Sequence, residues 1–351
     1  MSLSKLTAEN QSRMQQLYQR MGQEHLLPLW ELLAGLVTPE PQSPARVYKW
    51  SFDSMRHYLL EAGGLITAEQ AERRVLILEN PDMPGSSAIV PSLYAGLQLV
   101  LPGEIAPSHR HSQSALRFVL EGEGAFTALN GEKAVMSQFD LVLTPSWQWH
   151  DHGNETEQHM IWLDGLDIPA VRSFDAAFAE RLDEKAHKET QPPGDTLKRY
   201  GKNMRPFSGS AADTRPVHQP LFHYPYQDWM QSLRGVAEGS EIDPHLGHAL
   251  EFINPATGGS VMPIISAHVR LLPAGFETKT RQSSDGSVAT VVSGHGEARI
   301  GDKILKIGPR DIFTIPSWKE LQLRADSELV LFIYSDKGAQ EKLGLYREKC
   351  S

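Results

Sequence analysis

The chain has 351 residues, of which 40% are hydrophobic and 22% charged, a composition typical of globular proteins with two or three domains. Its formal net charge of −9 argues against nucleic acid or an anionic membrane surface as the main partner. The single cysteine, Cys350, excludes a disulfide within one chain and a cysteine-based metal site. Because no apolar run approaches the ~20 residues of a membrane span and no signal-peptide core begins the sequence, we expect a cytoplasmic location.

The N-terminal region is predicted to be mainly helical. Apolar residues at three- and four-residue spacings predict helices within 5–37, and shorter helices are predicted over 53–64 and 67–74. A strand-like run, VLILENP, follows at 75–81. We therefore expect a helical extension with a few strands rather than an independent enzyme.

From about Tyr94 the sequence changes to short strands broken by Gly, Pro and Asn-Gly. Asn130-Gly131 predicts a tight hairpin between two such strands. The strands continue to 161–167, where Pro169 is expected to open a long helix over 170–187. Residues 190–217 are rich in Gly, Pro, Thr and Arg and are predicted to be a linker.

An internal repeat organises the rest of the chain. The segment 101–111 aligns with 272–282, and 130–147 aligns with 300–318. Each copy has the size and regular turn spacing of an all-β unit, so we expect two similar β-barrels from a duplication. The expected division is an extension (1–90), a first barrel (91–168), a helix and linker (169–245) and a second barrel (246–340).

Four histidines occur as two pairs in the first copy. His109 and His111 lie two residues apart, as do His150 and His152, so each pair shares one face of a strand. In our alignment the second copy has Thr280 and Gln282 in place of the first pair, and Leu321 and Leu323 in place of the second. The pattern predicts a metal site in the first barrel and none in the second.

The spacing of these residues resembles the two motifs of the cupin family. Gly103, His109, His111 and Gly122 fit the first motif, and Pro145, His150 and Asn154 fit the second. The resemblance implies that His109, His111 and His150 are the ligands and that His152 is a neighbour. Ala115 and Leu116 stand where the family usually has a glutamate ligand, and Phe139 and Trp147 replace two glycines.

A bicupin with three histidines in one barrel resembles the gentisate 1,2-dioxygenases over most of this chain, from YKWSF (48–52) to NPATGGSVMPIISAH (254–268). The salicylate and 1-hydroxy-2-naphthoate dioxygenases share this layout. The resemblance implies two double-stranded β-helix barrels, one Fe(II) per subunit in the N-terminal barrel, and a homotetramer. It also implies cleavage of gentisate by O2 between the carboxyl-bearing carbon and the adjacent hydroxyl-bearing carbon, giving maleylpyruvate.

The missing glutamate has a physical consequence. Three neutral imidazoles suit Fe(II), Zn(II), Cu(II) or Ni(II) and leave the full 2+ charge uncompensated, which favours a chelating anionic ligand. Gentisate offers a carboxylate and an adjacent hydroxyl. If the histidines occupy one face of an octahedron, two positions take substrate and one remains for O2. No Gly-rich nucleotide loop follows a strand, so we expect no organic cofactor.

Further residues are assigned to the substrate. Arg117 lies on the strand after His111, at a position whose side chain is expected to face inward beside that histidine. Its planar guanidinium can bind a carboxylate through two parallel hydrogen bonds. Alternatively, Arg117 forms a structural ion pair. The second copy has Val288 in this region. By resemblance, Arg73, Gln98, His152 and Asp164 surround the substrate, and Tyr94 is expected to line the ring pocket.

Each of these residues has an expected role. His152 is expected to hydrogen-bond the substrate or move a proton. Asp164 either fixes an imidazole or arginine or caps a loop. One of Arg73 and Arg74 is expected to be a solvated or intersubunit charge.

The remaining histidines and tryptophans are expected to have structural roles. His245 and His248 are expected to be structural, and Trp147 and Trp149 are expected to form core and pocket wall. The same cleavage of salicylate or 1-hydroxy-2-naphthoate is the nearest alternative. A metal-binding isomerase or a non-catalytic cupin is the alternative from another class.

Overall fold

The computed structural model describes residues 7–182, 188–202 and 219–351 of the chain. The chain forms two compact units, Met1–Gln42 and Ser43–Ser351. The helices are α1 (Ala8–Gln23), α2 (Leu29–Leu36), α3 (Phe52–Leu65), α4 (Ala68–Ala71), α5 (Ile168–Ser173), α6 (Asp195–Tyr200), α7 (Tyr226–Gly239) and α8 (Lys337–Lys342). None of the helices in these ranges combines the length and apolar character that crossing a membrane requires.

The first unit consists of the two helices predicted within 5–37. Thr7 caps α1 by accepting a hydrogen bond from the backbone N–H of Asn10 at 3.3 Å. Tyr18 links the helices, because its hydroxyl accepts from Trp30 Nε1 and donates to Glu31, both at 2.8 Å. No residue of α2 is buried, so its apolar side chains lie exposed within this unit.

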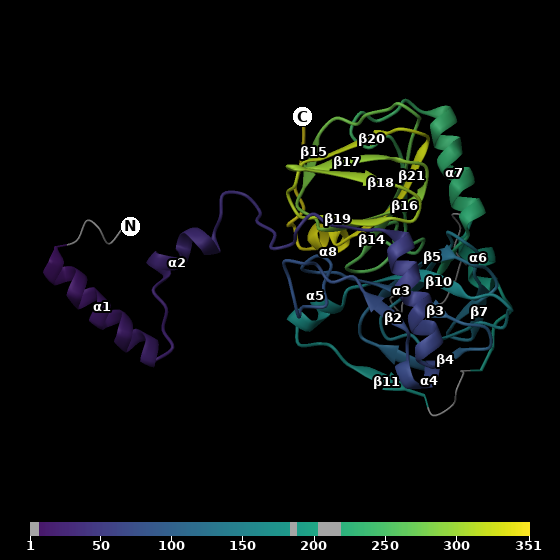
Figure 1. Ribbon diagram of the computed structural model, residues 1–351, viewed down its shortest axis with the longest axis horizontal. Helices are drawn as coiled ribbons and strands as arrows, with labels where there is room; N and C mark the ends of the chain where they lie inside the picture. The colour runs from purple at the N-terminus through teal and green to yellow at the C-terminus, as the bar shows by residue number, and fades with distance from the viewer. Residues whose placement is uncertain (1–6, 183–187, 203–218) are drawn as a thin grey trace, which may run out of the picture. The chain divides into compact units, whose positions relative to one another are not determined.

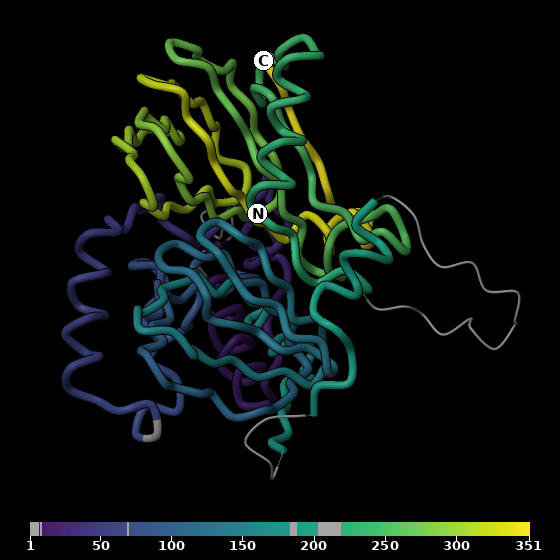
Figure 2. Tube along the Cα trace, turned by 90° about the vertical axis from the view of Figure 1, so that its right-hand side faces the viewer, coloured from purple at the N-terminus to yellow at the C-terminus, as the bar shows by residue number. Residues whose placement is uncertain are grey.

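The second unit contains four antiparallel sheets, which confirms the prediction of two barrels (Figures 1 and 2). The two sheets of the first barrel have the orders β12-β8-β5-β10-β3-β2 and β11-β4-β9-β6-β7. Their strands are β2 (Val75–Ile77), β3 (Tyr94–Val100), β4 (Ile105–His111), β5 (Ala115–Glu121), β6 (Phe126–Leu129), β7 (Glu132–Val135), β8 (Leu141–Thr144), β9 (His150–Gly153), β10 (Met160–Leu166), β11 (Ala179–Arg181) and β12 (His223–Tyr224).

The two sheets of the second barrel have the orders β1-β19-β16-β21-β14-β13 and β18-β17-β20-β15-β22. Their strands are β1 (Lys49–Trp50), β13 (His248–Phe252), β14 (Ser266–Leu272), β15 (Arg281–Ser283), β16 (Ser287–Ser293), β17 (Gly296–Ile300), β18 (Lys303–Ile307), β19 (Ile312–Ile315), β20 (Leu321–Ala325), β21 (Leu329–Ser335) and β22 (Glu348–Cys350). Thus a strand from the N-terminal segment, β1, completes a sheet of the C-terminal barrel.

The hairpin at Asn130-Gly131 is confirmed. β6 and β7 pair up to Leu129 and Glu132, which leaves these two residues as the loop. Both have positive φ, 47° for Asn130 and 90° for Gly131, as a type I′ turn requires.

The long helix predicted over 170–187 is wrong. The helix α5 ends at Ser173, and residues 179–181 form β11, which pairs with the edge of β4 so that Ala179 lies opposite His111. Pairing satisfies backbone groups that would otherwise leave an open sheet edge, and this outweighs the local preference for helix. Residues 183–187 lie outside the described part. The predicted linker contains α6, and its residues 203–217 are likewise not described.

The register of the repeat needs a correction of one residue. In the first barrel His109 lies opposite His150, and in the second Arg281 lies opposite Leu321. The backbone N–H of Trp147 donates to the carbonyl of His111, and that of Trp318 donates to the carbonyl of Ser283. The counterparts of His109 and His111 are therefore Arg281 and Ser283, not Thr280 and Gln282. Leu321 and Leu323 keep their assignments, whereas β5 and β16 align Arg117 with Ala289 rather than Val288.

Both copies repeat the same unusual backbone positions. Phe139 and Trp147, which replace the two motif glycines, have φ of 68° and 63°. Their counterparts Arg310 and Trp318 have φ of 66° and 61°. The left-handed turns are thus kept although the side chains are large, a conformation that normally costs about 1–2 kcal/mol per residue.

Gly294 lies in the turn between β16 and β17 and tests how tightly that turn is packed. Its φ is +85°, and an added Cβ would lie 2.0 Å from the carbonyl oxygen of Glu328, whereas a Cβ on Gly275 (φ +80°) would meet nothing within 4 Å. We expect Gly275→Ala to lower the free energy of unfolding by about 1–2 kcal/mol through backbone strain alone. Gly294→Ala should cost roughly 1–3 kcal/mol more because of the clash. Denaturant unfolding of both variants checks this, and equal losses would contradict it.

Candidate metal centre

Two neighbouring strands bring three histidines together. The antiparallel strands β4 and β9 place His109 opposite His150, and His111 follows His109 by two residues on the same face. A ligand nitrogen from each ring can be chosen so that all three lie within 4.8 Å of one another. The ring centroids of His109 and His111 lie 4.1 and 4.8 Å from that of His150. These three side chains could hold a metal ion.

Backbone carbonyls orient all three rings. The Nδ1 atoms of His109, His111 and His150 lie 2.9, 2.7 and 2.8 Å from the carbonyl oxygens of Pro107, Gln113 and Gln148. If each Nδ1–H donates to its carbonyl, Nε2 carries the lone pair, the arrangement usual for metal-binding histidines. The Nε2 of His109 contacts the guanidinium of Arg73, which must move aside for this ring to bind a metal. Among the described residues, Nε2 of His111 and of His150 is buried and has no hydrogen-bond partner. The donor set therefore fits a divalent transition metal.

Burial keeps these imidazoles neutral. It lowers the pKa of His109 to about 3, with a further contribution from the nearby charge of Arg73. Burial also lowers the pKa of His111 to about 4 and that of His150 well below its usual range. Since a metal binds the neutral imidazole, the trio is ready to coordinate an ion at neutral pH without first losing protons.

Arg117 lies in the interior of the first barrel, only 1% exposed. Its Nη1 donates to Thr144 Oγ1 at 2.7 Å, and its Nε lies 3.4 Å from Asp164 Oδ1. That contact is an ion pair without hydrogen-bond geometry, because Nε has no hydrogen-bond partner in the described structure. Burial lowers the pKa of Arg117 to about 10, so the guanidinium remains charged at neutral pH.

Asp164 is held by two neighbours. It accepts a hydrogen bond from Trp162 Nε1 at 3.1 Å and lies directly opposite Arg117 in the register of β5 and β10. Burial raises its pKa, and the charges of Arg117 and Arg73 oppose that shift. The roles of Trp162 and Thr144 were not anticipated, since an isolated tryptophan or threonine on a buried strand gives no functional signal in the sequence.

Strand register places two more predicted residues on the same interior face. β3 pairs with β10 so that Gln98 lies opposite Trp162, and Tyr94 lies four residues earlier on that face. Both are buried, and Gln98 Oε1 has no hydrogen-bond partner among the described residues. Burial raises the pKa of Tyr94, so its hydroxyl keeps its proton at neutral pH.

His152 lies beside the trio and is fully buried. Its ring centroid lies 5.4 Å from that of His150. Its Nδ1 contacts Thr127 Oγ1 at 3.0 Å, and its Nε2 has no partner in the described part of the chain. Burial lowers its pKa well below the usual range, the charge of Arg117 adding to the effect. The contact with Thr127 was not expected from the sequence.

The two adjacent arginines differ in environment. The guanidinium of Arg73 contacts the ring nitrogens of His109. Arg74 is buried, pairs with Glu104 at 2.8 Å and donates to the carbonyl of Ile66. Arg74 is therefore not a solvated charge. A cavity of about 790 Å³ opens beside these residues, lined by Arg73, His109 and His111 together with parts of α4 and β11.

The remaining predicted residues lie elsewhere. His245 contacts the carbonyl of Thr280 at 3.1 Å, and neither it nor His248 belongs to a metal-ligand group in the described ranges. Trp147 and Trp149 are half-buried, with the guanidinium carbon of Arg110 at 4.4 and 4.7 Å from their rings. They pack around this cation outside the three histidines.

Comparisons with known proteins agree with the fold. The model of the cupin domain matches residues 96–166. Gentisate 1,2 dioxygenase 1 from Aquipseudomonas alcaligenes is 47% identical over 348 residues, covering 99% of each chain. Gentisate 1,2-dioxygenase from a Streptomyces species is 35% identical over 347 residues, covering 97% of each chain.

Among solved structures, the salicylate 1,2-dioxygenase from Pseudoaminobacter salicylatoxidans in its adduct with gentisate superposes with a TM-score of 0.91. That protein is 34% identical to this chain, and the match covers 99% of this chain and 95% of the other. Sequence identity over nearly the whole length accompanies the same two-barrel fold. The chain belongs to the gentisate 1,2-dioxygenase family of ring-cleaving bicupin dioxygenases.

Proposed function

We propose that this protein is an Fe(II)-dependent dioxygenase that cleaves the aromatic ring of gentisate with O2 to give maleylpyruvate, with both oxygen atoms entering the product. The observation that carries the proposal is a trio of neutral imidazoles close to a buried, charged arginine. The 47% identical relative is a gentisate dioxygenase, and the salicylate dioxygenase of similar fold forms an adduct with gentisate.

In this proposal His109, His111 and His150 hold one iron ion per subunit. Iron is one of several divalent metals that suit three imidazoles, and family membership selects it. When bound, iron supplies the electron transfer that links O2 to the aromatic ring. The protein supplies no carboxylate at the position of Ala115 and Leu116, so an anionic substrate completes the charge balance.

Arg117 is proposed to bind and orient the substrate carboxylate. A guanidinium binds carboxylates through parallel N–H donors, and burial strengthens the interaction by excluding water. The Nε of Arg117 is free of hydrogen bonds within the described structure and so has a donor to offer. The contacts with Thr144 and Asp164 fix the guanidinium in place.

The other substrate residues have complementary roles. Gln98 offers an unpartnered amide oxygen, and neutral His152 offers an unpartnered Nε2 that can accept a hydrogen bond from a substrate hydroxyl. Because burial and the charge of Arg117 lower the pKa of His152, hydrogen bonding rather than proton uptake is the role that we assign to it. Tyr94 lines the pocket that holds the aromatic ring of the substrate. Arg73 binds the substrate at the entrance of the cavity that it lines with His109 and His111. Asp164 positions Arg117 rather than touching the substrate, because it is an ion-pair partner of that arginine.

The organisation of the whole protein forms part of the proposal. We assign metal binding to the barrel at 91–168 and none to the barrel at 246–340. Residues 1–90 form the N-terminal extension and 169–245 the helix and linker, and both segments add strands to the barrel sheets. A homotetramer is proposed with the extension as a contact, because α2 exposes Leu29, Trp30, Leu33 and Leu36. The composition and the single cysteine support a cytoplasmic location.

Oxygen uptake tests the reaction. Iron-reconstituted protein should consume one O2 per gentisate, and a product absorbing in the near ultraviolet should accumulate. Salicylate and 1-hydroxy-2-naphthoate, assayed in parallel, decide between the alternative substrates. Uptake with one of these two and none with gentisate would reassign the substrate. No uptake with any hydroxybenzoate would overturn the dioxygenase assignment.

His111→Ala should lose both iron and activity, because it removes one of three ligands. Iron content per subunit is measured by elemental analysis alongside oxygen uptake. His245→Ala is the matched control, since this histidine lies outside the metal-ligand group and should leave both quantities unchanged. Full iron occupancy in His111→Ala would show that the ligand set is wrong.

Arg117→Met should raise KM for gentisate about 10- to 100-fold, since a hydrogen bond to a charged group contributes roughly 1.5–3 kcal/mol. Iron content should not change. Arg117→Lys keeps the charge without the planar fork and should lie between wild type and Arg117→Met. Loss of iron in Arg117→Met would instead assign this arginine a structural role.

A further inference from the structure

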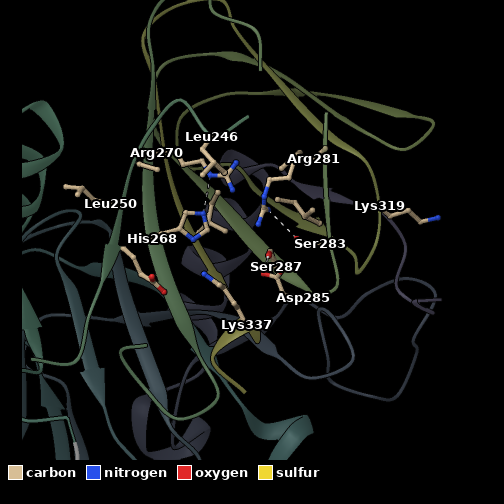
Figure 3. A pocket seen from close by; sticks show the side chains of 15 residues that line it. Leu246, Leu250, His268, Arg270, Arg281, Ser283, Asp285, Ser287, Lys319 and Lys337 are labelled. Atoms are coloured by element: carbon tan, nitrogen blue, oxygen red, sulfur yellow. Dashed lines mark hydrogen bonds between the residues drawn. The ribbon is translucent and has the colours of Figure 1, made fainter. Parts of the chain in front are cut away.

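The second barrel contains a polar cavity of its own, which the family assignment leaves without a role. Its volume is about 220 Å³, roughly seven times the ~30 Å³ that a water molecule occupies in the liquid. Figure 3 shows its lining, with Arg270 and Arg281 turned toward the same space between β14 and β15. Apolar side chains, including Leu246, Ile315 and Ile333, complete the wall.

This cavity corresponds to the metal centre of the first barrel. Arg281, Ser283 and Leu321 occupy the positions of His109, His111 and His150, and all three line the cavity. The second barrel therefore lacks the metal ligands but has a cavity at the same position, where Arg281 and Ser283 replace two of the histidines.

A second arginine stands on β14. Arg270 occupies the position that Gln98 has in the first barrel, because β3 and β14 pair with β10 and β21 in the same register. The substitution places a cation where the first barrel has an amide. Both arginines thus replace residues of the proposed iron and substrate site.

Arg270 is a buried charge with a spare donor. It is 3% exposed, and its Nε donates to Nε2 of His268 at 3.1 Å. Its Nη1 is buried and has no hydrogen-bond partner among the described residues. Burial lowers the pKa of Arg270 to about 10, so it is still a cation at neutral pH. Because a buried donor without a partner is destabilising, the site is suited to an acceptor that is not part of the chain.

The other charges around the cavity are largely paired. Arg281 donates to Tyr346 at 2.6 Å and to Glu348 at 2.8 Å, and Lys337 lies 3.5 Å from Glu341. Burial lowers the pKa of His268 well below its usual range, so that ring adds no charge. The positive charge of Arg270 is the one most deeply placed in this cavity.

One acceptor in the lining is also unsatisfied. Asp285 is 6% exposed, and its Oδ2 accepts from Ser287 at 3.2 Å, while its Oδ1 has no partner in the described part of the chain. A free acceptor near a free cationic donor matches a ligand that carries both a hydroxyl and a carboxylate. The apolar wall suits a hydrocarbon or ring between them.

We propose that the cavity of the C-terminal barrel is a binding site for a small hydroxycarboxylic acid, with Arg270 holding the carboxylate and Asp285 accepting from the hydroxyl. Ser283, whose Oγ accepts from Arg281 at 3.3 Å, offers its hydroxyl as a further donor in the lining. The site is separate from the proposed iron centre and needs no metal.

Isothermal titration of the intact, iron-loaded protein with 4-hydroxybenzoate tests this site. On the proposed function, Arg117→Met should weaken binding in the first barrel, so this background isolates the second. In it, 4-hydroxybenzoate should bind with one site per subunit, and adding Arg270→Met should weaken that binding at least about tenfold. Arg270→Lys should give a smaller loss and guards against a folding defect, which circular dichroism would reveal.

Lys319→Met is the matched control. Lys319 also lines the cavity, but its ammonium points away from the other side chains in Figure 3. Its removal should leave the affinity within about twofold of the parent, because an exposed charge contributes little. Unchanged binding in both Arg270 variants, or no binding in the Arg117→Met background, would overturn the proposal. Equal affinity for inorganic phosphate would show a plain anion site and overturn the assignment to hydroxycarboxylic acids.

Discussion

The alternation of side chains along paired strands is the constraint on which the site depends. Neighbours across an antiparallel pair share a face, and a shift of one residue sends every side chain to the opposite face. In the first barrel this register sends His109, His111 and His150 inward from two strands, and Arg117 and Asp164 inward from two others. The arrangement of the metal-binding and substrate-binding side chains therefore depends on the backbone hydrogen bonds that set the strand register.

Buried polar side chains are destabilising unless they are neutral, hydrogen-bonded or paired, and the two barrels satisfy this requirement in different ways. The first keeps its imidazoles neutral by burial and orients them through backbone carbonyls. The second places an arginine beside a neutral histidine and pairs Arg281 with Glu348. A duplicated scaffold thus supports two kinds of interior because the strands fix positions while leaving the identity of the side chain free.

The sequence was sufficient for the features that depend on local pattern. The two strand-like copies, the Asn130-Gly131 hairpin and the H-x-H spacing are all short-range signals. Features set by distant pairing were not predictable: residues 179–181 become a strand because the edge of β4 is available, although their neighbours favour helix. The one-residue error in aligning 272–282 arose because a gap between two similar copies cannot be placed without hydrogen-bond partners. It concealed Arg281 and Ser283, and with them the correspondence between the two cavities.

The strand β1 couples the ends of the chain. Lys49 pairs with Asp311 across 262 residues, and Trp50 lies opposite Ile312 in the outermost position of a C-terminal sheet. During synthesis β1 leaves the ribosome long before β19, its pairing strand, has been made. It therefore stays unpaired while the first barrel is synthesised. The two barrels, despite their origin as copies, cannot then mature as two self-sufficient modules. The first strand to be made, β1, finds its partner only when β19, near the other end of the chain, has been synthesised.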